Sequence, residues 1–236
     1  MTGKTGRGER ADATRELILV TAERLFAEHG VFAVSNRQVS EAAGQGNNAA
    51  VGYHFGTKTD LVRAIVRKHA LPVEQLRLRM VAEAGDSSDV RDWVACLVRP
   101  ITDHLAELGS PTWYARFAAQ VMTDPGLREI VVTDSLDASS LHRIIQGLDE
   151  CLPDLPAEVR AERGDMARQL MVHMCAERER ALALGSVVRI LPGSRSLARS
   201  ERQALGAATP RSSWRDAGTG LIDAIVGLWL APVTRP

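Results

Sequence analysis

The fold is decided by residues 31–60, which read VFAVSNRQVSEAAGQGNNAAVGYHFGTKTD. Ser35 can cap a short helix there, and Gln38, three residues later, completes a capping box. Gly44 ends that helix, and after a turn a second short apolar run reaches Phe55. Two short helices joined by a glycine-containing turn, after one longer helix, predict a helix-turn-helix that places its second helix in the major groove of DNA.

Apolar residues recur at intervals of three and four over most of the chain, which is the period of amphipathic helices. Residues 13–29 show this period first, and residues 157–184 and 214–230 carry it in the second half. No segment alternates in the manner of a strand. The sequence therefore predicts an all-α fold. Residues 186–213 are rich in Ser, Arg, Gly and Pro, and we expect a mobile connection there.

The composition fits one or two helical domains, with 45% apolar residues, 25% charged residues and a formal net charge of zero. Residues 1–70 carry ten basic and seven acidic side chains, a mild excess that permits a nucleic-acid face. No apolar run is long enough to span a membrane, and the polar N-terminus has no signal-peptide core. Three separated cysteines fit neither a disulfide framework nor a zinc site. We expect a cytoplasmic protein with no metal, cofactor or membrane partner, which joins the nucleoid when it binds DNA.

The segment after Gly44 carries side chains suited to a DNA groove. Asn47 and Asn48 offer paired donors and acceptors for base edges. Lys58 lies in the first turn of the next helix, where it can reach a phosphate. Small residues permit close approach to the bases and two ring residues reach the groove edge, and these are Ala49, Ala50, Gly52, Tyr53 and His54.

Packing is the competing interpretation for part of this segment. Phe55 is expected to be a buried anchor, whereas burial and exposure of Tyr53 stay equally open. Lys4, Arg7 and Arg10 allow a minor-groove arm. A solvated, disordered tail is the favoured interpretation, and residues 1–12 are therefore expected to form a flexible N-terminal arm.

Large apolar and aromatic side chains of the C-terminal region are candidates for lining a ligand cavity. Residues of these types form plain helical cores as readily as pockets, so the cavity is one of two interpretations. The candidate ligand-binding residues are Trp93, His104, Trp113, Tyr114, Phe117, Met171 and Met174.

Residues 14–70 resemble the N-terminal domain of the TetR (tetracycline-repressor) family of bacterial transcriptional regulators. Two departures are visible: the interval from Gly44 to Tyr53 is one residue longer than usual, and Gly52 stands where an aromatic residue is common. The resemblance rests on the order and spacing of Ala22, Leu25, Phe26, Gly30, Ser35, Val39, Ala43, Gly44, Tyr53, His54, Phe55, Lys58 and Leu61.

The resemblance implies about nine helices, a dimer and an effector cavity in the larger C-terminal domain. By position, Ser35 and Lys58 resemble phosphate contacts of the family, Arg37 and Gln38 flank the groove, and residues 47–54 form the recognition helix. We expect DNA binding by residues 13–70, and effector binding and dimerisation by residues 71–236.

The expected function is a repressor that leaves double-stranded operator DNA when a small apolar effector binds. The homodimer would form through the helices near residues 157–184 and 214–230, because both are more apolar than a monomer surface tolerates. An enzyme is not expected, since the chain lacks a His-Glu-x-x-His, Cys-x-x-Cys or Gly-x-Ser-x-Gly motif. The alternative is a helical small-molecule carrier or protein-interaction module without DNA binding, which has no reason to carry the segment from Ser35 to Lys58.

Overall fold

A computed structural model of the chain describes residues 5–136, 139–190 and 213–233, and every regular element in these ranges is a helix. The all-α prediction is confirmed, and the described ranges contain ten helices, close to the expected nine. The helices are α1 (Thr5–His29), α2 (Asn36–Ala42), α3 (Ala50–Phe55), α4 (Lys58–Ala84), α5 (Val90–Glu107), α6 (Tyr114–Thr123), α7 (Pro125–Leu136), α8 (Ser139–Cys151), α9 (Ala157–Ile190) and α11 (Trp214–Leu230).

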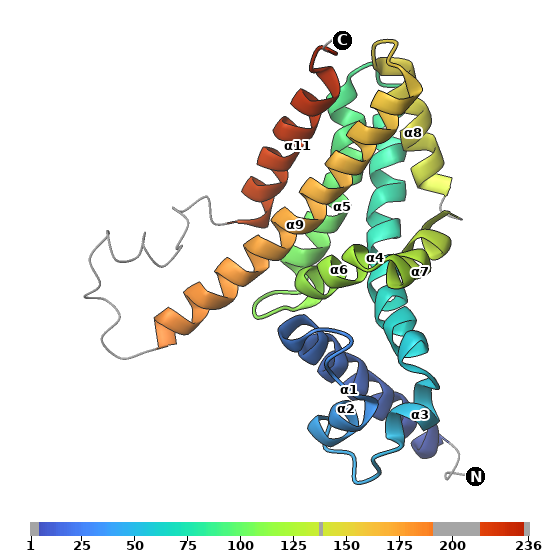
Figure 1. Cartoon of the computed structure of the whole chain (residues 1–236), viewed down its shortest axis with the longest axis vertical. Helices are drawn as coiled ribbons and strands as arrows, with labels where there is room; N and C mark the ends of the chain where they lie inside the picture. The colour runs from blue at the N-terminus through green and yellow to red at the C-terminus, as the bar shows by residue number, and fades with distance from the viewer. Residues whose placement is uncertain (1–4, 137–138, 191–212, 234–236) are drawn as a thin grey trace.

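The helices build an elongated molecule with a small domain at one end (Figure 1). Helices α1, α2 and α3 form that end, and α4 runs from it into the larger C-terminal domain. Helices α6 and α7 lie across the middle, while α5, α8, α9 and α11 form the opposite end, where the chain also terminates. The helix-turn-helix is therefore carried at the tip of the molecule.

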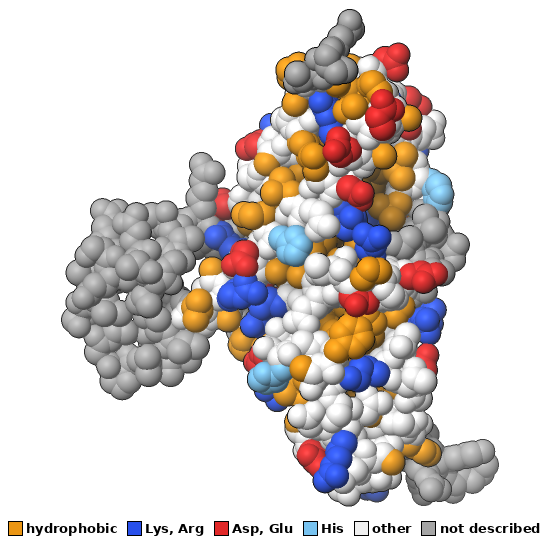
Figure 2. Space-filling model, viewed as in Figure 1, with side chains coloured by type: hydrophobic (Ala, Val, Ile, Leu, Met, Phe, Trp, Pro, Cys, Tyr) orange, Lys and Arg blue, Asp and Glu red, His pale blue; other side chains and the backbone are white. Residues whose placement is uncertain are grey.

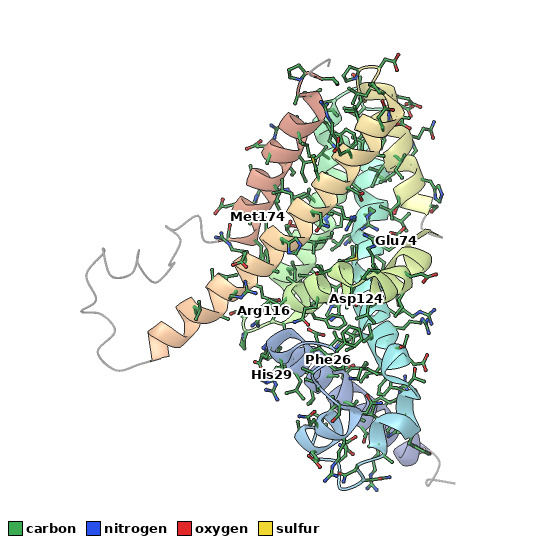
Figure 3. All side chains as sticks on the ribbon, viewed as in Figure 1. Phe26, His29, Glu74, Arg116, Asp124 and Met174 are labelled. Atoms are coloured by element: carbon green, nitrogen blue, oxygen red, sulfur yellow. The ribbon has the colours of Figure 1, made fainter. Side chains whose placement is uncertain are left out.

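Two hydrophobic cores hold this arrangement together, and the first core crosses the domain boundary. It joins buried side chains of α1 to α4 with Phe117 and Val121 of α6 and Leu127 and Ile130 of α7. Phe26 stacks on Phe117 with ring centroids 6.2 Å apart, and Figure 3 shows Phe26 between α1 and α6. The second core lies among α5, α8, α9 and α11. The small domain thus shares its interior with the middle of the protein.

Helix α4 connects the two ends and contains Pro72. The sequence predicts a kink or break at this proline, but the helix continues through it to Ala84. Pro72 has no N–H, so it cannot bond the carbonyl of Lys68 one turn earlier. The expected domain boundary at residue 70 consequently falls inside a continuous helix.

Parts of the two segments that the sequence predicts to be flexible are helical in the structure. Helix α1 begins at Thr5, so residues 5–12, expected in the arm, are helical. Helix α9 extends to Ile190, six residues beyond its predicted end. The rest of the expected arm, and most of the expected mobile connection, lie outside the described residues. Residues 5–12 are mostly polar, whereas the extension of α9 includes Val187, Val188 and Ile190, so only α1 extends into sequence without an apolar period.

Helix α9 also fixes the start of α6 through a buried carboxylate. Trp113 precedes α6 and provides no side-chain cap. Glu179 of α9, which is 1% exposed, accepts the backbone N–H groups of Ala115 and Arg116 at 3.0 Å each. The same carboxylate accepts Nε of Arg116 at 2.9 Å (Figure 3 labels Arg116). A long-range ion pair therefore replaces the missing local cap.

No helix in the described part of the chain has the length and apolar character that crossing a membrane requires.

Candidate nucleic-acid interface

Helix α2 begins with the predicted capping box. Ser35 Oγ accepts the backbone N–H of Gln38 at 3.2 Å, and Gln38 Oε1 accepts the N–H of Ser35 at 2.8 Å. Both side chains are exposed, but the carbonyl oxygen of Gln38 is occupied by the cap. Arg37 is also exposed, and its Nε donates to Glu41 at 2.8 Å. This end of α2 thus presents the amide N–H groups of Gln38 to solvent, while the Ser35 hydroxyl donates to Gln38 Oε1 at 2.9 Å and the Arg37 guanidinium is held by a helical ion pair.

Helix α3 begins at Ala50, three residues later than predicted. Asn47 Oδ1 accepts the N–H of Ala49 at 2.9 Å and shapes the turn that precedes the helix. The N–H of Val51 donates to the buried hydroxyl of Ser40 at 3.3 Å, which ties α3 to α2. Ala50 is only 6% exposed. Ala50, which the sequence predicts at the groove, instead packs its methyl group into the first core.

The outward side of α3 consists of the side chains that are suited to a groove. Tyr53 is 83% exposed, which decides between the two interpretations of this residue. Asn48, Ala49 and Gly52 are exposed, and a Cβ added at Gly52 would meet no atom within 4 Å. His54 is half-buried and lies edge-on to Tyr53, with ring centroids 4.9 Å apart. Phe55 is partly buried against the first core, as expected of an anchor.

Arg15 of α1 holds the C-terminal end of α3, a contact that sequence reasoning missed. Its Nη1 donates to the carbonyl of His54, and its guanidinium lies 4.4 Å from the ring centre of Phe55. A cation over an aromatic face is attracted by the ring quadrupole. No sequence signal links these residues, because they lie 39 or more positions apart.

Lys58 occupies the predicted first turn of α4, beside a second capping box between Thr57 and Asp60. The hydrogen bond from Thr57 is the main reason that the pKa of Asp60 is lowered. The amine of Lys58 donates to the carbonyl of Val31 at 3.2 Å, so it supports the turn between α1 and α2. An ammonium group has three donors, so this bond leaves Lys58 capacity for a phosphate.

The predicted ligand-binding residues are divided between several surroundings. Trp93 is fully buried in the second core, where its ring fills the space beside Gly147. Phe117 and Trp113 belong to the first core. Met171 is partly buried against the second core, whereas Met174 is 50% exposed on α9 (Figure 3).

His104 of α5 lies against the ring of Tyr114 of α6, which in turn lies beside Phe117. Separately, a hollow of about 590 Å³ lies between residues 153–156 and 230–233, and none of the seven predicted residues lines it.

A buried chain of polar groups lies beside Tyr114. His69 Nε2 lies 2.8 Å from Glu23 Oε2, and His69 Nδ1 lies 2.9 Å from His104 Nε2. Burial is the main reason that the pKa of His104 is lowered to about 4, and the nearby charge of His69 adds to it while Glu23 opposes it. This chain connects α1, α4 and α5, and only His104 was singled out from the sequence.

Fold and site together define a DNA-binding protein with a terminal helix-turn-helix and a larger helical domain. Comparison with known families agrees. A sequence model described as "Bacterial regulatory proteins, tetR family" matches residues 18–65, and one described as "Tetracyclin repressor-like, C-terminal domain" matches residues 95–189. The chain belongs to the TetR family, and it is a DNA-binding transcriptional regulator.

Two relatives and one solved structure show how similar individual known proteins are to this chain. The HTH-type transcriptional repressor AcnR of Corynebacterium glutamicum is 28% identical over 159 residues, covering 64% of this chain and 76% of the relative. AcnR of Corynebacterium diphtheriae is 29% identical over 152 residues, covering 61% and 72%. The structure of SmeT, the repressor of the Stenotrophomonas maltophilia multidrug efflux pump SmeDEF, matches with a TM-score of 0.54 and 19% identity, covering 94% of this chain and 92% of SmeT. The last comparison shows the shared fold.

Proposed function

We propose that this regulator is a repressor that binds its operator through the exposed side of α3 and the N-terminus of α4. The observation that carries the proposal is the division of α3 into two sides. Ala50 and Val51 are buried, while Gly52 and Tyr53 face solvent, as does Asn48 in the turn before the helix. A six-residue helix anchored on one side and open on the other projects from the tip of the molecule, as insertion into a groove requires.

Within that interface we assign different tasks to different residues. Asn48 has a free amide in the exposed turn before α3, suited to a base edge, whereas Asn47 uses its carbonyl oxygen to shape that turn. Ser35, Arg37 and Lys58 flank α3 and are suited to phosphates. Gln38, Ala49, Gly52, Tyr53 and His54 complete the proposed surface, on which Gly52 permits close approach.

Two substitutions test this assignment in a mobility-shift series on genomic fragments selected by the purified protein. Lys58→Ala should weaken binding to all sequences alike and reduce the salt slope by about one phosphate contact. Asn48→Ala should relax preference at one operator position and cost about 1–3 kcal/mol there. Arg79→Ala, which removes an exposed charge from the far half of α4, is the matched control. Wild-type behaviour of both interface variants would remove these residues from the site.

We further propose that the dimer of this family forms here through the outer sides of α9 and α11. Met166, Met174 and Leu184 of α9 are 47%, 50% and 56% exposed, and Leu230 of α11 is 52% exposed. Figure 2 shows apolar side chains along this face, interspersed with charged ones. Exposed apolar side chains of this number on neighbouring helices favour burial against a second copy.

The dimer assignment is tested by Met174→Glu, and Leu78→Glu, at an exposed position of α4, is the control. A charge buried at the interface should dissociate the dimer, and sedimentation equilibrium measures its dissociation constant. Equal dissociation constants for the two variants would place the interface elsewhere.

For effector release, we propose a small apolar molecule that binds beside His104, Tyr114 and Phe117, where α4, α5 and α6 meet. The other four candidates are parts of the two cores or of the α9 surface, and they are assigned no contact. An inducer must prefer the released state by roughly 10⁴-fold to move the population from mostly bound to mostly free. A thermal-shift screen of apolar compounds, followed by operator release, tests this. Hits whose effect survives Tyr114→Ala would contradict the location.

A further inference from the structure

Three titratable side chains from three helices form one hydrogen-bonded chain inside the protein. Glu23 of α1, His69 of α4 and His104 of α5 are 6%, 2% and 5% exposed. His69 is the middle member, with Nε2 on Glu23 and Nδ1 on His104. The ring of Tyr114 of α6 stacks on His69 with centroids 3.8 Å apart. The chain therefore links α1, which supports the helix-turn-helix, to the C-terminal domain.

The number of protons on this chain decides whether it can hold together. When both imidazoles are neutral, His69 donates to Glu23 and accepts from His104. When one proton is added, the His69 imidazolium donates to both neighbours, and neutral His104 accepts. When both rings are protonated, every ring nitrogen carries a hydrogen, so the two facing nitrogens have no acceptor between them. Two buried cations also repel each other.

We propose that the Glu23–His69–His104 chain is a proton-sensitive latch between the DNA-binding domain and the C-terminal domain. It holds while the two imidazoles share a hydrogen bond, and it opens when both are protonated. The link to repression rests on the proposed function, whereas the latch itself does not.

The surroundings of the latch contain little that would neutralise a second proton. Glu23 is its carboxylate, and it already pairs with His69. Burial raises the pKa of the Tyr114 hydroxyl, so that group stays protonated. Arg77 of α4 is a further positive charge near Tyr114 and pairs with Glu74. On the α11 side of α5, Arg99 bonds to Arg215 and Thr219 rather than to the chain.

The direction of the pH effect follows from His104. Its pKa is about 4 in the closed structure, against the ordinary value of 6.5 when water reaches the ring. Between pH 6.5 and pH 4, His104 is therefore protonated in the open state and neutral in the closed state. The latch is fully closed above that window and weakens as the pH falls through it. At pH 5 the open state gains about thirtyfold relative to pH 7.5.

The test compares wild type with His104→Gln between pH 7.5 and pH 5. A glutamine amide can keep a hydrogen bond to His69 but cannot be protonated. Both proteins retain His54 and the other histidines, so the difference between them isolates residue 104. Scanning calorimetry reports whether the two domains unfold as one unit, and fluorescence anisotropy on a selected genomic DNA fragment reports affinity.

We expect wild type to unfold in one transition at pH 7.5 and in two at pH 5, while His104→Gln unfolds in one transition at both. The affinity of wild type for DNA should fall by up to about thirtyfold relative to the variant over the same range. His104→Leu, which removes the bond at every pH, should weaken DNA binding roughly tenfold at pH 7.5.

The outcomes separate the latch from the DNA-binding proposal. Parallel pH behaviour of wild type and His104→Gln in calorimetry overturns the latch, whether or not His104→Leu folds. Calorimetry needs no DNA, so absence of DNA binding by wild type would contradict the proposed function alone.

Discussion

The DNA-facing end and the interdomain joint of this regulator are built by opposite means. At the DNA-facing end, residues 35–60, contacts between near neighbours start the helices, such as the capping boxes of α2 and α4 with partners three residues apart. The interdomain joint consists of Phe26, Phe117 and the Glu23–His69–His104 chain. Its hydrogen bonds join residues 35 and 46 positions apart. Local caps therefore start the helices that meet DNA and contacts from Ser40 and Arg15 orient α3, whereas the joint depends on tertiary packing throughout.

The exposure of the two regions differs in the same direction. At the DNA-facing end, polar side chains point to solvent and contribute little to stability, because surface contacts are individually weak. In the joint, aromatic and titratable side chains are buried, and each removed partner leaves a cavity or an unsatisfied group. Substitutions in the joint should lower the free energy of unfolding, whereas those at the DNA-facing end should mainly change binding.

The largest effect is expected for Phe117→Ala, which removes a fully buried ring from the first core. Loss of the stack on Phe26 and the resulting cavity should lower the free energy of unfolding by about 3–5 kcal/mol. Tyr53→Ala, which removes an exposed ring of similar size, should change it by less than about 0.5 kcal/mol. Urea unfolding followed by circular dichroism measures both, and comparable losses would erase the proposed difference between the regions.

A smaller effect should follow from pH in the joint. The pKa of His104 is lowered to about 4 in the folded protein, so the unfolded chain binds a proton first as the pH falls. Stability is therefore unaffected above pH 6.5 and is lost by up to about 3 kcal/mol as the pH approaches 4. The difference in free energy of unfolding between wild type and His104→Gln, taken from urea curves measured every half pH unit, should change by that amount. A difference in stability between wild type and His104→Gln that stays constant with pH would contradict buried His104 as the cause of the loss.

The smallest effect is expected at the DNA-facing end. Ser35→Ala removes the hydroxyl that caps α2 and should lower the free energy of unfolding by about 1 kcal/mol. Thr59→Ala changes an exposed residue in the first turn of α4 and serves as the control. A loss of 3 kcal/mol or more for Ser35→Ala would show that the capping box supports tertiary structure as well.

This contrast explains what could be predicted from the sequence. The helix-turn-helix could be predicted from the sequence, because caps, glycine stops and a period of 3.6 residues are local signals. The burial of Ala50 was not, since the orientation of a six-residue helix depends on α2 and on the hydroxyl of Ser40. The contact of Arg15, a residue of α1, with the end of α3 could not be predicted for the same reason.

Residue type alone identifies the seven ligand-binding candidates, and residue type does not distinguish a pocket from a core. The structure accordingly divides them among two cores and a surface. His69 and Glu23 were missed, because a polar residue on an apolar helix does not reveal its partner. The long helix α9 was predicted but its end was not, since weak helix formers such as Gly185 and Ser186 can be included in a helix that packing has already started.

The proline inside α4 has a mechanical consequence. Pro72, three residues beyond His69, has no N–H, so the helix lacks one backbone hydrogen bond there. The helix therefore bends more easily at this point. Lys58 lies fourteen residues away, a lever arm of about 21 Å at 1.5 Å per residue. A flexure of only about 5° at the proline would displace that tip by about 2 Å, enough to take a side chain out of hydrogen-bonding range of a phosphate.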